Sequence, residues 1–253
     1  MTFIHRVPDR EAVCRAYDFW SHFYDVVAAP WEYGARAQAL ATLPGGVGSS
    51  VLDVGIGPGS NFFKVAKAAG PGATVYGVDL SRKMVRKASR RLRRSGIGTA
   101  RVMEADAVTL PFANESFDTV LSSYLLDLMP IEVIACALTE FLRVLKPSGR
   151  AVLVNLTKLA ADRTTWYERC YQALPAMGQA YVFGGCRPVR LAHLVSAAGF
   201  LAANRTIVQH GLASEILVAR KPAADLVAGR GAGPVTLAVS GGHRGPAAGF
   251  TTT

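Results

Sequence analysis

Residues 51–62 read VLDVGIGPGSNF, and this stretch decides the fold. An apolar run rich in valine ends around Asp53, and glycines follow at Gly55, Gly57 and Gly59. A strand, a glycine turn and a helix in this order are typical of open α/β sheets, which bind ligands at the carboxyl ends of their strands. Glycine lets the backbone approach a ligand closely, so the stretch predicts a nucleotide-like ligand at this turn.

The composition indicates a folded protein. Of the 253 residues, 50% are hydrophobic and only 18% are charged. No apolar run reaches the roughly 18 residues that a membrane span needs, and the N-terminal residues lack the apolar core of a signal peptide. The four cysteines are scattered without metal-ligand spacing, so we expect reduced thiols, no metal site and a cytoplasmic protein.

Much of the net charge of +10 lies in residues 81–96, SRKMVRKASRRLRRSG. Met84, Ala88 and Leu92 recur every four residues, which predicts a helix with a narrow apolar stripe and Ser81 as its N-cap. The cations of this helix, Arg82 to Arg94, form either a solvated outer face or a contact with an anionic partner such as a membrane or a nucleic acid.

Short β-rich runs alternate with helical runs from residue 51 to about 155, which predicts a mainly parallel, doubly wound α/β sheet with helices on both faces. The predicted strands are SVLDVG, TVYGVDL, TARVMEAD, FDTVLSSY and GRAVLVNL; the helices are NFFKVAKAAG, the basic segment and IEVIACALTEFLRVLK. Pro147-Ser148-Gly149 is predicted to be the turn that ends the last of these helices.

The remaining segments flank this core, which we place at residues 46–221 with a lid insertion at about 160–188. Residues 1–45 are predicted to form helices, broken at Pro30, that act as an N-terminal lid. A short helix in VRLAHLVSAAGF precedes NRTIVQH and SEILVARK, which we expect to form an antiparallel pair and so complete a seven-stranded sheet. Residues 222–253 are rich in Gly, Ala and Pro and are predicted to be a disordered or loosely attached tail.

Acidic residues end three successive strands of this pattern. The glycines do not follow the GxGxxG spacing of a dinucleotide site, and Asp53 stands where it would repel a pyrophosphate. Asp79 lies 20 residues after Gly59, an offset that suits the hydroxyls of a ribose, and Asp106 is able to accept a hydrogen bond from an adenine amine. The three acids therefore favour an adenosine that carries an amino acid.

The chain resembles the class I S-adenosylmethionine-dependent methyltransferases, through VLDVGIGPG, GVDLS..M, EADA...PF...SFD.V and EFLRVLKPSGRAVLVN. The stretch AYDFWSHFYD is similar to the ubiquinone/menaquinone C-methyltransferases and the bacterial phosphatidylethanolamine N-methyltransferases. The resemblance implies a Rossmann-like fold and S-adenosyl-L-methionine as the cofactor. The residues that it implies for binding the cofactor are Tyr17, Tyr24, Asp53, Gly55, Gly57, Asp79, Leu80, Met84, Asp106, Ala107 and Ser122.

Some of these residues also have structural explanations. Tyr17, Trp20 and Tyr24 share one face of a helix and would equally form a buried stripe, and Met84 would equally be a core residue.

An oxygen or carbon acceptor would need a general base, whereas an amine need only be neutral. The candidate bases are Asp127, which follows the fourth strand, and His22, with His193 and His210 as further options. Arg187, fixed between glycines and a proline in FGGCRPVR, would bind a carboxylate or phosphate of the acceptor or make a surface salt bridge.

The aromatic segment that includes Tyr171 and Tyr181 would line an apolar acceptor pocket or merely cover the edge of the sheet. We therefore expect a small or lipid-like organic acceptor. The alternatives are an RNA methyltransferase, a non-catalytic S-adenosylmethionine-binding protein and an NAD-dependent dehydrogenase. The sequence at the fourth strand, SSYLLD, lacks the pattern usual in enzymes that methylate nucleic-acid amines.

Overall fold

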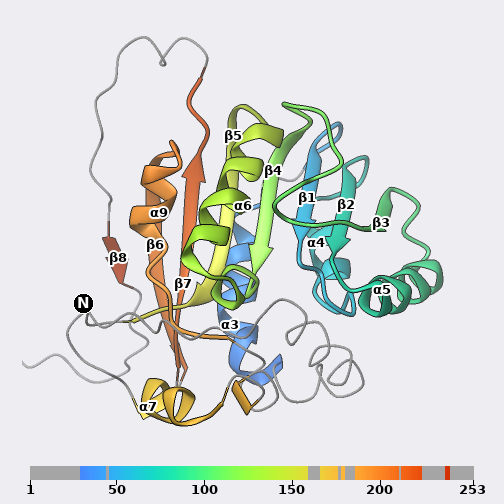
Figure 1. Ribbon diagram of the computed structural model, residues 1–253. Helices are drawn as coiled ribbons and strands as arrows, with labels where there is room; N and C mark the ends of the chain where they lie inside the picture. The colour runs from blue at the N-terminus through green and yellow to red at the C-terminus, as the bar shows by residue number, and fades with distance from the viewer. Residues whose placement is uncertain are drawn as a thin grey trace, which may run out of the picture.

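The computed structural model describes residues 29–43, 46–158, 166–175, 178–179, 186–210, 212–223 and 237–239. These residues form one mixed sheet with the strand order β3-β2-β1-β4-β5-β7-β6-β8. The first five strands in the chain are parallel, as predicted, and β7 and β6 complete the sheet as an antiparallel hairpin beside β5 (Figure 1). The strands are β1 (Ser50–Val54), β2 (Thr74–Asp79), β3 (Ala100–Glu104), β4 (Phe117–Ser123), β5 (Leu145–Leu156), β6 (Leu201–His210), β7 (Leu212–Arg220) and β8 (Leu237–Val239).

Helices cover both faces of the sheet, so its central strands are buried on both sides and are almost continuously apolar. The helices are α3 (Ala29–Ala41), α4 (Phe62–Ala68), α5 (Arg82–Ser95), α6 (Ile131–Val144), α7 (Trp166–Ala173) and α9 (Ala192–Ala197), with a 3-10 turn, η1 (Leu126–Leu128). Side chains of α6 and α9 pack on one face, and those of α3, α4 and α5 pack on the other.

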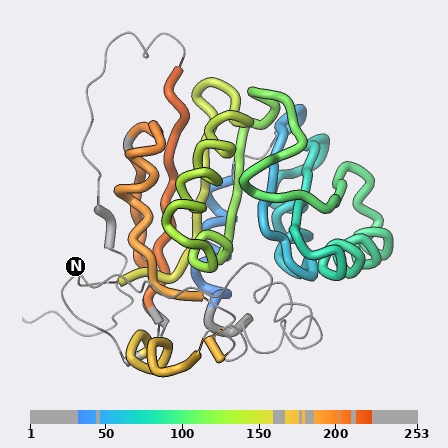
Figure 2. Tube along the Cα trace, viewed as in Figure 1, coloured from blue at the N-terminus to red at the C-terminus, as the bar shows by residue number. Residues whose placement is uncertain are grey.

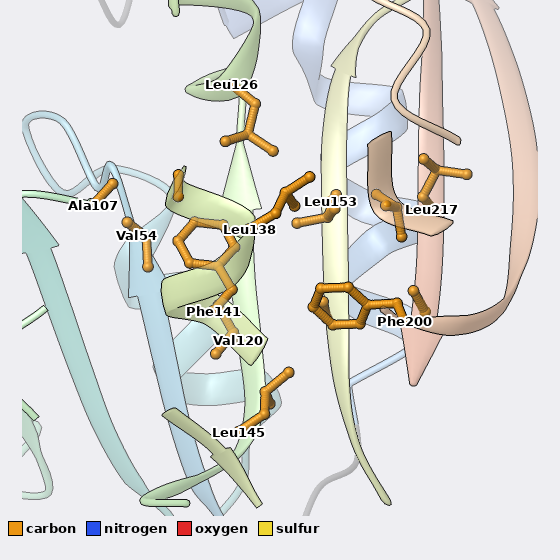
Figure 3. Close-up of a cluster of buried hydrophobic side chains, with 14 of the residues drawn as sticks. Val54, Ala107, Val120, Leu126, Leu138, Phe141, Leu145, Leu153, Phe200 and Leu217 are labelled. Carbon is orange, nitrogen blue, oxygen red and sulfur yellow. The ribbon is translucent and has the colours of Figure 1, made fainter. Parts of the chain in front are cut away.

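The first core lies between α6 and the strands β4 and β5. Figure 3 shows Leu138 and Phe141 of α6 directed at Val120 and Leu153 of the sheet. All four side chains have no exposed surface. This core fixes the order of β4 and β5, and therefore the position of the residues that follow β4.

One local feature differs from the sequence-based expectation. Helix α6 ends at Val144, and the predicted turn Pro147-Ser148-Gly149 lies inside the long strand β5 as an irregularity, with Ser148 at φ +62°. Pro30 lies in the first turn of α3, where its missing N–H costs no helical hydrogen bond; the helix predicted before it lies outside the described residues.

The sheet has one strand more than the seven predicted, because β8 pairs in parallel with residues 205–207 of β6. This short strand comes from the segment that we expected to be a loose tail. The predictions for Tyr17, His22, Tyr24 and Tyr181 lie outside the described residues, as do most of residues 1–45 and about half of residues 160–188.

The carboxyl ends of β1, β2 and β4 point toward one end of the molecule, where α7 also lies (Figures 1 and 2). The candidate site residues gather at this end. Within the part of the chain that the structure describes, no helix is both long and apolar enough to cross a membrane.

Candidate functional site

The glycine turn after β1 is held against the neighbouring strand β2. The backbone N–H groups of Gly55 and Ile56 both donate to the carbonyl oxygen of Val78, at 2.8 and 3.1 Å. Asp53 is paired in register with Gly77 of β2 and with Leu121 of β4. The predicted site residues of β1, β2 and β4 therefore lie side by side at one edge of the sheet.

The three glycines of the turn have different roles. All have positive φ angles, of +81°, +54° and +88°, which glycine adopts without strain. A Cβ atom at Gly59 would lie 2.9 Å from the Cβ of Ala88, and one at Gly55 would lie 3.0 Å from Leu125, so these glycines allow close packing. A Cβ at Gly57 would meet nothing within 4 Å, so Gly57 borders open space that a ligand can enter.

Asp79 connects the glycine turn to the end of β2. Its two carboxylate oxygens accept the backbone N–H groups of Gly57 at 2.8 Å and Ser81 at 2.9 Å. Burial raises the pKa of Asp79, and these two hydrogen bonds oppose that shift. A carboxylate has about four acceptor positions, so both oxygens keep capacity for further donors such as ribose hydroxyls.

Asp53 is almost completely buried, with 3% of its surface exposed. Burial raises the pKa of its carboxyl to about 7; the nearby Arg36 lowers it and Asp79 raises it further. An acid in this position gains most from a cationic ligand group, since such a group repays the cost of ionisation in a buried site.

Ser122, at the end of β4, is paired in register with Val54 and is 1% exposed. Its hydroxyl oxygen has no hydrogen-bond partner within the described residues. Buried hydroxyls in proteins usually have a partner, so this oxygen is available to a polar group of a ligand.

The predicted adenine-binding segment follows β3. The Asp106 carboxylate accepts the N–H of Val108 at 3.3 Å, and Ala107 is buried. Leu80 is 37% exposed, whereas Met84 is 1% exposed and lies in the packed interior. Met84 therefore has the burial of a core residue, which was the structural alternative for this position.

Arg143 and Glu140 of α6 hold the loop that follows this segment, and sequence reasoning missed both. The guanidinium of Arg143 donates to the carbonyl oxygens of Phe112 at 2.8 Å and Leu110 at 3.0 Å. Glu140 pairs with Arg143 at 2.7 Å and accepts the N–H of Leu110 at 2.8 Å. The sequence signal that could have indicated this pair is the spacing of three residues between an acid and a base in a helix, which brings their side chains together.

Asp127 and Arg187 form a second polar cluster, under α7. Asp127 has no exposed surface; its Oδ2 accepts the N–H of Leu156 at 3.1 Å, and its Oδ1 has no partner within the described residues. Burial raises its pKa to about 7. Arg187 is 4% exposed and donates from its backbone to the Asp127 carbonyl oxygen and from its guanidinium to that of Met129. The alternative of a surface salt bridge for Arg187 is therefore wrong.

Helix α7 closes over this cluster through buried contacts. The Tyr167 hydroxyl donates to the carbonyl oxygen of Cys186 at 2.6 Å, and Tyr167 stacks on Tyr171. Tyr171 has no exposed surface, and the equally buried Glu168 pairs with Lys158, two residues beyond the end of β5. These contacts fix α7 in place against the carboxyl ends of the strands.

Among the histidine candidates whose side chains the structure describes, His193 contributes to neither cluster. His193 is exposed on α9, whose buried residue packs into the core on the face covered by α6. His22 lies outside the described residues, as does the side chain of His210. No group of three or more His, Cys, Asp or Glu side chains in the described ranges is arranged to hold a metal ion.

A family model described as "Methyltransferase domain" matches residues 51–149. The ubiquinone/menaquinone biosynthesis C-methyltransferase UbiE of Burkholderia multivorans (strain ATCC 17616 / 249) is 30% identical over 171 residues, which are 67% of this chain and 68% of that protein. The nocamycin O-methyltransferase of Saccharothrix syringae is 32% identical over 139 residues, 55% of this chain. The chain spans about half (49%) of the length of that relative.

Solved structures agree with the fold. A SAM-dependent methyltransferase from Aquifex aeolicus has a TM-score of 0.59 at 18% identity, covering 82% of this chain and 98% of that one. The [4+2]-cyclase SpnF has a TM-score of 0.61 at 24% identity, covering 77% of this chain and 84% of that one. Both likenesses show the fold alone.

Proposed function

Because this chain belongs to the class I S-adenosylmethionine-dependent methyltransferases, we propose that it transfers a methyl group from S-adenosylmethionine to a small or lipid-like organic acceptor. The observation that carries the proposal is the open space at Gly57, bordered by the turn that Asp79 holds and by the buried carboxyl of Asp53. Two carboxylates would repel a phosphate, whereas an adenosine with an amino-acid end offers them hydroxyl donors and an ammonium group.

The residues present fit this cofactor. Asp53 would hold its ammonium group, Asp79 its ribose hydroxyls, and Asp106 with the backbone of Ala107 its adenine edge. When bound, the cofactor supplies an electrophilic methyl group. The chain must then hold the acceptor in line with this group and exclude water, and proximity accounts for most of the rate.

Calorimetry with S-adenosylmethionine, S-adenosylhomocysteine and NAD tests the cofactor. We expect binding of the first two and none of NAD; binding of NAD alone would favour the dehydrogenase. Incubation with methyl-labelled cofactor and fractionated cell extract tests the reaction. Label in a small-molecule or lipid fraction supports the proposal, whereas label in RNA favours an RNA methyltransferase. Binding of the cofactor without transfer of label to any fraction favours a non-catalytic S-adenosylmethionine-binding protein.

The acceptor class rests on the relatives and on α7. The relatives named above are called a ubiquinone/menaquinone C-methyltransferase and a nocamycin O-methyltransferase, and both names describe organic acceptors. The buried aromatic residues Tyr167 and Tyr171 make α7 an apolar cover at this end of the sheet, tied next to Arg187 by the hydrogen bond from Tyr167 to Cys186. Residues 29–43 pack on the sheet through α3, so we further propose that the rest of residues 1–45 and about 160–188 cover the acceptor, with Tyr17, Tyr24 and Tyr181 contributing.

Asp127 is our candidate general base, because a buried carboxyl with a pKa of about 7 is suited to accept a proton near neutral pH. Asp127→Asn should lower kcat at least about 100-fold and remove the rise in kcat between pH 6 and 8. A kcat that keeps its wild-type pH dependence in this variant would exclude Asp127 as the base and leave His22.

We also propose that the cationic face of α5 holds the enzyme on an anionic membrane. Met84 and Ala88 face the core, so the cations on the opposite side reach solvent, among them Arg86, Arg90, Arg93 and Arg94. Near an anionic surface each cation adds on the order of 1 kcal/mol to the binding free energy, and salt screens this contribution.

The exposed thiols of Cys136 and Cys170 are free, which supports a cytoplasmic location.

Sedimentation with phosphatidylserine-containing vesicles tests this contact. We expect binding at low salt and release at high salt, and loss of binding when Arg86, Arg90, Arg93 and Arg94 are all changed to Glu. The matched control makes the same change of charge at exposed cations that lie elsewhere: Lys67, Arg101, Arg190 and Arg220. Equal loss in both variants, or no vesicle binding by the wild type, would contradict the proposal.

A further inference from the structure

Helix α3 carries a charged pair on its buried face. Ala35, Ala39 and Leu43 recur at helical spacing and pack into the core beside α4 and the sheet. Glu32 and Arg36 continue this stripe toward the start of the helix, and Glu32 is 9% exposed. Placing two charges on a packed face is costly, so an ionic group there needs a reason.

The pair lies at the end of α3 that faces the carboxyl ends of the strands. At the other end of the helix, the carbonyl oxygen of Thr42 accepts a hydrogen bond from Arg150, a residue paired with Thr119 near the start of β4. Thr42 therefore marks the end of α3 that lies near the amino ends of the strands. Glu32 and Arg36 are at the opposite end of the helix, toward the carboxyl ends of the strands where the candidate site lies. Behind the sheet in Figure 1, α3 runs down to that edge.

The Arg36 guanidinium is held in place from two sides. Its Nη2 lies 2.8 Å from Oε2 of Glu32, and its central carbon lies 5.3 Å from the centre of the Tyr124 ring. The side chain of Arg36 is 17% exposed. Arg36 is thus a partly buried cation with a restricted orientation.

Tyr124 is itself fixed in a strained conformation directly after β4. Its φ is +54°, which is uncommon for a residue other than glycine. Its hydroxyl bonds to the Ser214 hydroxyl at 2.8 Å, and its N–H donates to Val154 at 2.7 Å. Strain of this kind persists where the surrounding structure holds it and is common at ligand sites.

Arg36 and Asp53 lie close enough for their charges to interact. Arg36 is the charged group that most favours the ionised form of Asp53, against the effect of burial. The amino-acid end of S-adenosylmethionine carries one positive and one negative group, and Asp53 complements only the positive one. A fixed cation beside Asp53 supplies the missing complement for a carboxylate.

We propose that Arg36 binds the carboxylate of the cofactor's amino-acid end, and that Glu32 and Tyr124 position its guanidinium for this contact. The inference rests on the proposed function, since it assigns a further residue to the cofactor site. It competes with a purely structural role, in which Arg36 only balances the charges of Glu32 and Asp53.

Calorimetry with two ligands that differ only in the carboxylate separates these roles: S-adenosylmethionine and decarboxylated S-adenosylmethionine. Measurements at pH 8.5 lie above the pKa of about 7 that Asp53 has in the wild type. Arg36→Gln should bind S-adenosylmethionine about 10- to 100-fold more weakly, as expected for one lost hydrogen bond between charged groups, and bind the decarboxylated ligand within about twofold of wild type. Arg36→Lys should retain part of the affinity.

Asp79→Asn is the matched control, because loss of a ribose contact should weaken both ligands equally. Should Arg36→Gln fail to fold, Glu32→Gln replaces it, since loss of the orienting carboxylate should lower the preference for the ligand with the carboxylate. Equal weakening of both ligands by the Arg36 or Glu32 variants, or no weakening, would overturn the inference. Failure of the wild type to bind S-adenosylmethionine at all would instead overturn the proposed function.

Discussion

Replacing Asp53 by Asn should stabilise the ligand-free protein at alkaline pH while impairing cofactor binding. The reason is the burial of the Asp53 carboxyl, which raises its pKa in the folded chain from an ordinary 3.8 to about 7. Between these values the unfolded chain has released the proton and the folded chain still holds it. Stability therefore falls as pH rises through this window, and Asn, which does not titrate, avoids the loss.

The size of the effect follows from the position of the window. Each pKa unit corresponds to about 1.4 kcal/mol. Between pH 5.5 and 8, the contribution of Asp53 to the free energy of unfolding changes only up to the folded pKa of about 7. This span of roughly 1.5 units corresponds to about 2 kcal/mol. We expect the free energy of unfolding of Asp53→Asn, relative to wild type, to increase by about this amount between the two pH values.

Urea denaturation at pH 5.5 and 8, without ligand, measures this difference. Asp118→Asn is the control without pH dependence in this window. Its hydrogen bonds with Lys146 and Ser50 outweigh partial burial and lower the pKa of Asp118 below 3.8, so it is ionised in the folded and the unfolded chain at both pH values, and the variant should be destabilised equally at pH 5.5 and 8. In the wild type, affinity for S-adenosylhomocysteine should rise as pH rises through 7, because the ammonium group binds the ionised form of Asp53. An Asp53→Asn variant whose relative stability is the same at both pH values would refute the reasoning.

Three further outcomes follow from the geometry of the site. Gly57→Ala should cost only about 1–2 kcal/mol of stability, because of the positive φ at this position, yet it should strongly weaken cofactor binding measured by calorimetry. Gly59→Ala should destabilise the protein more, because the added Cβ would collide with Ala88. Arg143→Ala should lower the denaturation midpoint and weaken S-adenosylhomocysteine binding, since the loop after the adenine segment loses its hydrogen bonds. Asp127→Asn should raise stability at pH 8 relative to pH 5.5, in the same direction as Asp53→Asn, because burial raises its pKa as well.

The sequence by itself determined the parallel core of the sheet and the edge at which the candidate cofactor residues meet. Strand, glycine turn and helix are adjacent in the chain, so periodicity and spacing identify them without long-range information. Parallel strands bring their carboxyl ends to one edge, which is why Asp53 and Asp79 were expected to meet. The predicted C-terminal hairpin was confirmed by the pairing of β6 and β7.

Only the tertiary structure decided how the charged residues around that site are buried. Arg36 meets Tyr124, and Tyr124 meets Ser214, across 88 and 90 residues of chain, and no local pattern encodes such a contact. The burial of Arg187 was equally hidden, because an arginine in a glycine-rich loop usually reaches solvent. Burial depends on what packs over a residue from elsewhere in the chain, and it is burial that sets the pKa values and the ionic preferences of this site.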